Sequence, residues 1–197
     1  VFFNLGGQLG QFGWRTPFWV YSSALLMLAL VLLYTWEPSE RDAGDVAKKA
    51  PHHASWAGFP TAKMLGIVAV TVFGSVLFYT VQIQSSVGLH ELGVTDPARA
   101  GFLTSIASIG VVLGTWIYSH IGRWPVFRLL AIEFFMLAVG FLLMSRAGDT
   151  TPFLIGCFIN QLGAGMLLPT LLVWAMSLLT FEMRGRGAGI WTGAFSV

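Results

Sequence analysis

The side chains in this sequence that could bind a solute or carry a proton are few, and most lie inside long apolar runs. In residues 64–90, Tyr79, Gln82 and Ser86 are spaced i, i+3 and i+7, which places them on one face of a helix. Gln84 is a further amide in the same run. An uncharged amide is costly in an apolar segment unless it meets protein or water. We therefore predict that these side chains either contact a solute or form hydrogen bonds between helices.

A second polar group lies in residues 150–181. Asn160 and Gln161 are adjacent amides and are candidates for the wall of a cavity. Trp174 is a further candidate, although an aromatic at helical spacing in an apolar run more often belongs to the core or faces lipid. The same run contains Gly163, Gly165 and Pro169. Small residues admit close packing and a proline frees a carbonyl and kinks a helix, so these three residues are hinge candidates, with a static kink as the alternative.

Glu133 is the one acidic residue inside an apolar run of this sequence. An ionisable side chain at such a position is a functional candidate by default, and here the chemistry would be the carriage of a proton. Arg128 is near in the sequence, so a structural ion pair or hydrogen bond is the alternative.

Motifs of enzymes and metal sites are missing from the sequence. It has no GxSxG, no HExxH and no paired aspartates inside an apolar run, so we do not expect an enzyme. His52 and His53 are adjacent imidazoles that we expect to be solvated, and neither a metal nor a cofactor is predicted. Cys157 is the single cysteine, which excludes an intramolecular disulfide. A net charge of +2 is too small to predict a nucleic-acid partner.

Composition identifies the apolar runs as membrane-spanning helices. Of the 197 residues, 55% are hydrophobic and 10% are charged, and the mean hydropathy is +0.73. A helix needs roughly 20 mainly apolar residues to cross a bilayer, and in hydrocarbon only helices or closed barrels satisfy the backbone. The runs are continuous and do not alternate as barrel strands do. We predict an all-α integral membrane protein with spans at residues 16–36, 64–90, 100–122, 125–145 and 150–181.

Positively charged residues predict the orientation of these spans. If the segment after residue 36 is cytoplasmic, eight arginines and lysines lie inside and three lie outside, which agrees with the positive-inside rule. Residues 37–61 are mixed in charge and have no apolar period, so we interpret them as a cytoplasmic linker. The linker separates residues 1–36, with one span, from residues 62–197, with four.

Three motifs lie beside the predicted spans. "GGQLGQFGWRTPFWVY" has closely spaced glycines followed by Gly13, Trp14 and Arg15, which we predict to form an outside turn. "YSHIGRW" is a cytoplasmic turn in which we expect Gly122 to take a positive φ and Arg123 to meet carbonyls or carboxylates at a helix end. "FEMRGRGAG" is a second turn on that side, where small residues allow close helix approach and arginines supply charge-assisted bonds. It contributes Arg184, Gly185, Arg186 and Gly189.

Together these motifs resemble the major facilitator superfamily of transporters. In that family a glycine-rich fifth helix precedes GWR, and a long cytoplasmic loop joins two six-helix halves, as residues 37–61 would. "YSHIGRW" keeps the Gly and the last Arg of the family's G-x-x-x-D-R-x-G-R, and Arg184 to Gly189 resembles its R-G-x-A-x-G segment. The resemblance implies a fragment from the end of helix five to the start of helix eleven of a twelve-helix bundle. It would hold about five complete transmembrane helices and two truncated end helices.

The resemblance also implies a function. We expect a secondary transporter that moves a small organic molecule by alternating access, with helices seven and ten lining the central cavity. By analogy we expect a proton-coupled exporter, an antiporter, in a bacterial inner or plasma membrane, monomeric when full length. An importer or facilitator of a sugar or metabolite is the alternative. A channel or a non-transporting receptor is the alternative from another class.

Overall fold

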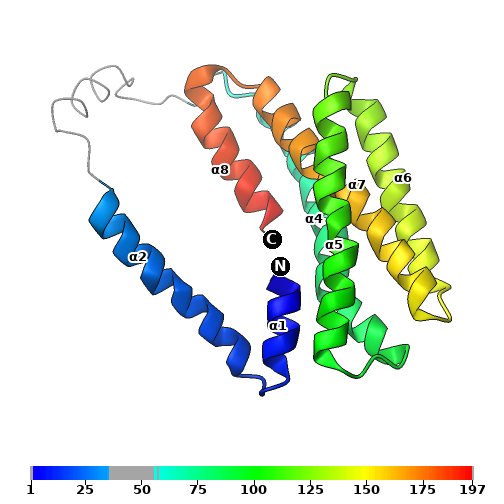
Figure 1. The fold of residues 1–197 in the computed structure, drawn as a ribbon. Helices are drawn as coiled ribbons and strands as arrows, with labels where there is room; N and C mark the ends of the chain where they lie inside the picture. Colours follow the sequence, from blue (N-terminus) through cyan, green and yellow to red (C-terminus); the bar gives the residue numbers. More distant parts are fainter. Residues whose placement is uncertain (1, 36–55, 57, 197) are drawn as a thin grey trace.

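The computed structural model describes residues 2–35, 56 and 58–196, and over these residues the chain is all-α, as predicted. Its elements are α1 (Phe2–Gly10), the short 3₁₀ helix η1 (Thr16–Ser22), α2 (Ser23–Tyr34), α4 (Thr61–Glu91), α5 (Pro97–Ile121), α6 (Val126–Ser145), α7 (Thr150–Ser177), the 3₁₀ helix η2 (Phe181–Met183) and α8 (Arg184–Phe195). Figure 1 shows α4 to α7 as a bundle of long helices, with the short α1 beside α5. Helix α8 packs on α4 and on α7.

Five segments of the described residues are long and apolar enough to cross a membrane, and they coincide with the five predicted spans. Helix α7 ends at Ser177, before the predicted end at residue 181, and α5 begins at Pro97, before the predicted start at residue 100. Helix α4 begins at Thr61, before its predicted start at residue 64, and covers 31 residues. Backbone hydrogen bonding continues there beyond the apolar run, into positions such as Lys63 that a spanning helix places at the interface.

Helix α7 lies between α5 and α6, and glycines make the contact with α5 close. Gly110 and Gly114 of α5 share one helix face at i, i+4 spacing. A Cβ on Gly110 would come 2.6 Å from the Phe158 carbonyl oxygen, and a Cβ on Gly114 would overlap the Leu162 carbonyl oxygen. This spacing of small residues lets the backbones of two membrane helices touch, and it sets the register of α5 against α7.

The contact between α6 and α7 is equally close. A Cβ on Gly140 of α6 would come 2.6 Å from the Asn160 Cβ, and a Cβ on Gly163 of α7 would come 2.9 Å from the Met136 Cβ. Of the glycines predicted as hinge candidates, Gly163 therefore packs on α6, whereas Gly165 packs on α5. Their hinge role stays a prediction.

Helices α1 and α2 differ in how they relate to the bundle. Helix α1 packs tightly on the start of α5, because a Cβ on Gly7 would come 2.5 Å from the Pro97 carbonyl oxygen and 3.1 Å from the Gly101 Cα. Helix α2 stands apart from the other long helices in Figure 1, and none of its residues is buried. Its sequence, SALLMLALVLLY, is apolar on every side, which suits a helix in hydrocarbon.

Two glycines test the predicted turns. Gly13 takes a φ of 114°, as a turn between η1 and α1 requires. The positive φ predicted for Gly122 is wrong, because this C-cap residue of α5 has a φ of −61°. A Cβ on Gly122 would come 2.8 Å from the Tyr118 carbonyl oxygen and 3.0 Å from its ring. A glycine is therefore needed at position 122 because Tyr118 lies so close, and not because of the backbone conformation of residue 122 itself.

Most of the predicted linker at residues 37–61, including His52 and His53, lies outside the described residues. The described part before α4 holds Trp56, which packs edge to face on Phe59 with ring centroids 5.1 Å apart. Phe59 is buried in a cluster with Met64 and Leu179. The end of this segment is therefore attached to the α4 and α7 side of the bundle.

Candidate functional site

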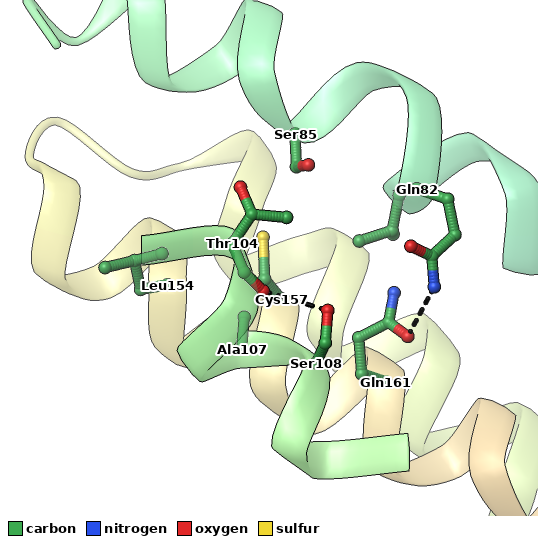
Figure 2. A pocket seen from close by; sticks show the side chains of 9 residues that line it. Gln82, Ser85, Thr104, Ala107, Ser108, Leu154, Cys157 and Gln161 are labelled. Carbon is green, nitrogen blue, oxygen red and sulfur yellow. Dashed lines mark hydrogen bonds between the residues drawn. The ribbon is translucent and has the colours of Figure 1, made fainter. Parts of the chain in front are cut away.

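Gln82 of α4 and Gln161 of α7 are joined side chain to side chain. The Gln82 Nε2 donates to the Gln161 Oε1 over 3.1 Å, and Figure 2 shows the two amides facing each other between their helices. Gln161 is 2% exposed, and Gln82 is half-buried. An amide offers two N–H donors and two acceptor lone pairs, so this one bond leaves both glutamines with capacity for further partners.

A small, partly enclosed cavity borders this pair, with a volume of about 10 Å³. That is room for one water molecule at most. Its polar lining consists of Gln82, Ser85, Thr104, Ser108 and Gln161. The hydroxyls of Thr104 and Ser108 donate to carbonyls of their own helix, each over 2.9 Å. Because a hydroxyl that donates keeps its lone pairs, both are available as acceptors.

A wider groove of about 290 Å³ adjoins this cavity and faces α1. Gln82, Ser85 and Thr104 border both spaces. The rest of the groove is lined by Ser86 of α4, by two glycines of α1 and by the first turns of α5. Helix α1 precedes the predicted linker and α4 follows it. The groove therefore lies between the two parts into which the sequence divides the chain, and it presents amides and hydroxyls there.

Glu133 is fully buried between α6 and α7. The Thr170 hydroxyl lies 2.5 Å from its Oε1 and 3.0 Å from the Met166 carbonyl oxygen, so two acceptors share one proton. The Glu133 Oε2 has no hydrogen-bond partner in the part of the chain that the structure describes. Arg128 is instead exposed, with its guanidinium 5.7 Å from the centroid of the Phe127 ring. Of the structural alternatives predicted for Glu133, the structure shows the hydrogen bond. A charge buried without a cation is costly, which keeps Glu133 a candidate for holding a proton.

Comparison with known families identifies the chain. Residues 3–197 match the family model of the Major Facilitator Superfamily. The chain belongs to the Major Facilitator Superfamily. Proteins of this superfamily are secondary transporters, so the chain is a multi-pass membrane protein of the transporter class. Comparisons with curated proteins and with solved structures found no match.

In this Major Facilitator Superfamily chain the other predicted residues of α4 point in different directions. The Tyr79 ring packs against Phe195 of α8, with centroids 5.6 Å apart. Gln84 is exposed and borders a separate pocket between α4, α6 and α7. Ser86 lines the groove that faces α1, as Gln82 does. The structure thus groups Ser86 with Gln82, and the binding role of all four stays a prediction.

Asn160 is next to Gln161 in the sequence but faces α6. It is fully buried, and its Nδ2 donates to the Leu137 carbonyl over 3.3 Å. Neighbouring residues of a helix point in directions about 100° apart, which separates the two amides. Trp174 packs in an apolar cluster between α4, α7 and α8. Neither side chain joins the pair formed by Gln82 and Gln161.

The arginines of the two predicted cytoplasmic turns lie near the surface of this superfamily chain. Arg123 and Arg184 are exposed. The Arg186 guanidinium lies 5.0 Å from the centroid of the Trp56 ring, a cation–π contact that links α8 to the segment before α4.

The close helix approach predicted for the second cytoplasmic turn depends on Gly187, which was not among the predicted residues. A Cβ on Gly187 would overlap the side chain of Leu179, which follows α7, whereas a Cβ on Gly185 or Gly189 would meet no atom within 4 Å. The predicted contact of small residues therefore runs through Gly187.

Sequence reasoning also missed a contact between Gln11, after α1, and Asp96, the N-cap of α5. The Asp96 Oδ1 accepts hydrogen bonds from Gln11 Nε2 over 3.1 Å and from the Ala98 N–H over 3.0 Å. The bond from Gln11, followed by that from Ala98, holds the pKa of Asp96 below its ordinary value. An Asp before Pro97 is a recognisable helix start. Its partner has no such signal, because Gln11 is 85 residues away in the sequence.

Proposed function

We propose that the protein is a secondary active transporter that moves a small organic molecule with neutral hydrogen-bonding groups by alternating access. The observation that carries this proposal is the pair formed by Gln82 and Gln161 at the groove that faces α1. In alternating access, two helical bundles rock about a site near the middle of the membrane. Residues 1–36 and 62–197 would belong to the two bundles, with residues 37–61 as the cytoplasmic linker.

The lining of the groove and of the adjoining cavity supports a neutral substrate. Among the described residues these two spaces are lined by amides, hydroxyls and apolar groups, and by no charged side chain. A charged group of a substrate would lack a counter-ion at this wall, which is costly away from water. A hydroxyl or carbonyl group could instead take the place of one glutamine in the amide pair. Such an exchange replaces one hydrogen bond by another and so changes the free energy little.

Proton coupling is the second part of the proposal, and Glu133 is its candidate. The buried carboxyl group has one oxygen on Thr170 and a second oxygen without a partner in the described part of the chain. Thr170 is on α7, the helix that carries Gln161. A change in the protonation of Glu133 would therefore act on the helix that holds half of the amide pair.

Export as the direction of transport rests on analogy with the superfamily. The same analogy supports a monomer in a bacterial inner or plasma membrane. Import or facilitated diffusion of a sugar or metabolite would use the same groove. A channel or a non-transporting receptor is the alternative from another class.

Flux into proteoliposomes tests this function, with protein expressed from its complete coding sequence. The probes are radiolabelled neutral compounds, a hexose, a nucleoside and a simple amide, each paired with a phosphorylated or carboxylated analogue. We expect saturable flux of a neutral probe that responds to an imposed pH gradient. Flux that does not saturate would favour a channel, and binding without flux would favour a receptor. Saturable flux of the charged analogues alone would overturn the neutral substrate.

A further inference from the structure

Pro169 interrupts the backbone hydrogen bonds of α7, although the helix continues from Thr150 to Ser177. Proline has no N–H, so the carbonyl four residues earlier, that of Gly165, receives no hydrogen bond from position 169. Within a membrane an unpartnered carbonyl is costly, because hydrocarbon offers no donor. A donor other than the N–H of position 169 therefore has to satisfy the Gly165 carbonyl.

Thr115 of α5 supplies this donor. Its Oγ1 lies 3.0 Å from the Gly165 carbonyl oxygen and 3.0 Å from the carbonyl oxygen of Val111 in its own helix. A hydroxyl has a single proton, so the two carbonyls share or exchange one donor. Thr115 lies at the exposed rim of the contact between α5 and α7, where lipid brings no competing donor.

The bond between the helices depends on their close backbone contact. A Cβ on Gly165 would overlap the Val111 carbonyl oxygen, and a Cβ on Gly114 would overlap the Leu162 carbonyl oxygen. Because both positions are glycine, the backbone of α7 comes within reach of a short hydroxyl side chain on α5.

The interruption at Pro169 also separates the two functional contacts of α7. Gln161, which pairs with Gln82, is one turn before Gly165, and Thr170, which binds Glu133, directly follows Pro169. We propose that Thr115 is a positioning residue for transport, because its bond to Gly165 sets how far α7 bends at Pro169, where a proline is expected to bend a helix. The bend in turn sets the placement of Gln161 relative to Thr170. The effect on transport rests on the proposed function, whereas the bend can be measured without a substrate.

The bend can be measured as the distance between the two ends of α7. Nitroxide labels on Thr151→Cys and Ser177→Cys, both at exposed positions, report this distance by double electron–electron resonance in lipid nanodiscs. In a straight helix the backbones of residues 151 and 177 would lie about 39 Å apart along the axis, at 1.5 Å per residue, and a bend shortens this distance. Cys157 is buried and does not compete for the label.

Thr115→Val removes the hydroxyl and keeps the shape of the side chain. We expect it to broaden the distance distribution at least twofold, and Thr115→Ser to restore a single narrow distance. In Pro169→Ala the restored N–H bonds the Gly165 carbonyl within α7, so the distance lengthens and added Thr115→Val has no further effect. Thr80→Val is the matched control, because the Thr80 hydroxyl donates to Val76 of its own helix. It should leave the distribution unchanged.

Two results would overturn the proposal. One is an unchanged distribution in Thr115→Val, and the other is equal broadening by Thr115→Val with and without Pro169→Ala. If Thr115→Val alone fails to fold, the double variant with Pro169→Ala is expected to fold, because the carbonyl is then satisfied within α7. Failure of the double variant to fold, with Pro169→Ala alone folded, would also contradict it.

Discussion

The side-chain amide nitrogen of Gln82 lies 3.1 Å from the side-chain oxygen of Gln161, and this contact joins α4 to α7 beside a groove that faces α1. The two residues are 79 positions apart in the sequence. A hydrogen bond of this kind contributes only about 1 kcal/mol net, so a solute can replace it at little cost. The pair is therefore suited to a site that must bind and release.

Gly114→Ala should destabilise the bundle by about 1–3 kcal/mol, because the added methyl group overlaps the Leu162 carbonyl oxygen. The matched control is Gly66→Ala on α4, where an added Cβ meets no atom within 4 Å. That change should leave stability unaltered or raise it by roughly 0.5–1 kcal/mol through helix propensity. Thermal unfolding of both variants in detergent micelles measures the difference. Equal unfolding temperatures would show that α5 and α7 are not in backbone contact.

Glu133→Gln should retain the fold, since the amide oxygen can still accept from Thr170, but should abolish uptake driven by a pH gradient. Exchange of unlabelled for labelled probe across the same membrane should continue, because that reaction needs no net proton movement. Proton-driven accumulation at the rate of the unmodified protein would remove Glu133 as the coupling residue.

Thr170→Val should lower the stability of the bundle without abolishing it. The change removes the one hydrogen bond that Glu133 accepts in the described part of the chain. Bonds of this kind between membrane helices contribute about 0.6 kcal/mol on average and up to about 1.7 kcal/mol. Ser177→Ala is the control, because its hydroxyl donates to Trp174 of the same helix. A loss no larger than that of the control would mean that the contact with Glu133 adds nothing to stability.

Asp96 should make the stability of the folded protein depend on pH under acidic conditions. Hydrogen bonds from Gln11 and Ala98 lower its pKa, so the folded state favours the carboxylate. The stabilisation is complete above the ordinary pKa of 3.8 and is lost as the pH falls through the lowered value. We expect the unfolding temperature of the unmodified protein to fall more steeply below that pH than the unfolding temperature of Asp96→Asn. Parallel curves for the two proteins would contradict the contact.

The spans of this chain could be predicted from its sequence because length and hydropathy act locally. Continuous apolar runs of about 20 residues leave the backbone no structure but a helix in hydrocarbon. The same local signals identified Gly13 as a turn residue. They were insufficient at Gly122, where the glycine serves the packing of Tyr118 and its φ is an ordinary helical one.

The grouping of site residues could not be predicted, because it depends on how each helix is rotated about its axis. Gln82 and Gln161 were recognisable as amides in apolar runs, but so was Asn160, which faces α6. Thr115 had no signal of its own. Its importance follows from the position of Gly165 on another helix, and that relation exists only in three dimensions.

The most direct measurement compares uptake by Gln82→Ala and Gln84→Ala in proteoliposomes, with the neutral probe that shows saturable uptake by the unmodified protein. Both changes remove the same side chain from α4, but Gln82 alone of the two bonds to Gln161 in the described structure. Loss of one such hydrogen bond should raise KM about three- to tenfold for Gln82→Ala, with membrane insertion unchanged. Gln84→Ala should leave KM within about twofold of the unmodified protein, because Gln84 borders a separate pocket and lines neither the groove nor the cavity beside the amide pair. Unchanged kinetics for Gln82→Ala, or a larger effect of Gln84→Ala, would contradict a substrate site at the amide pair.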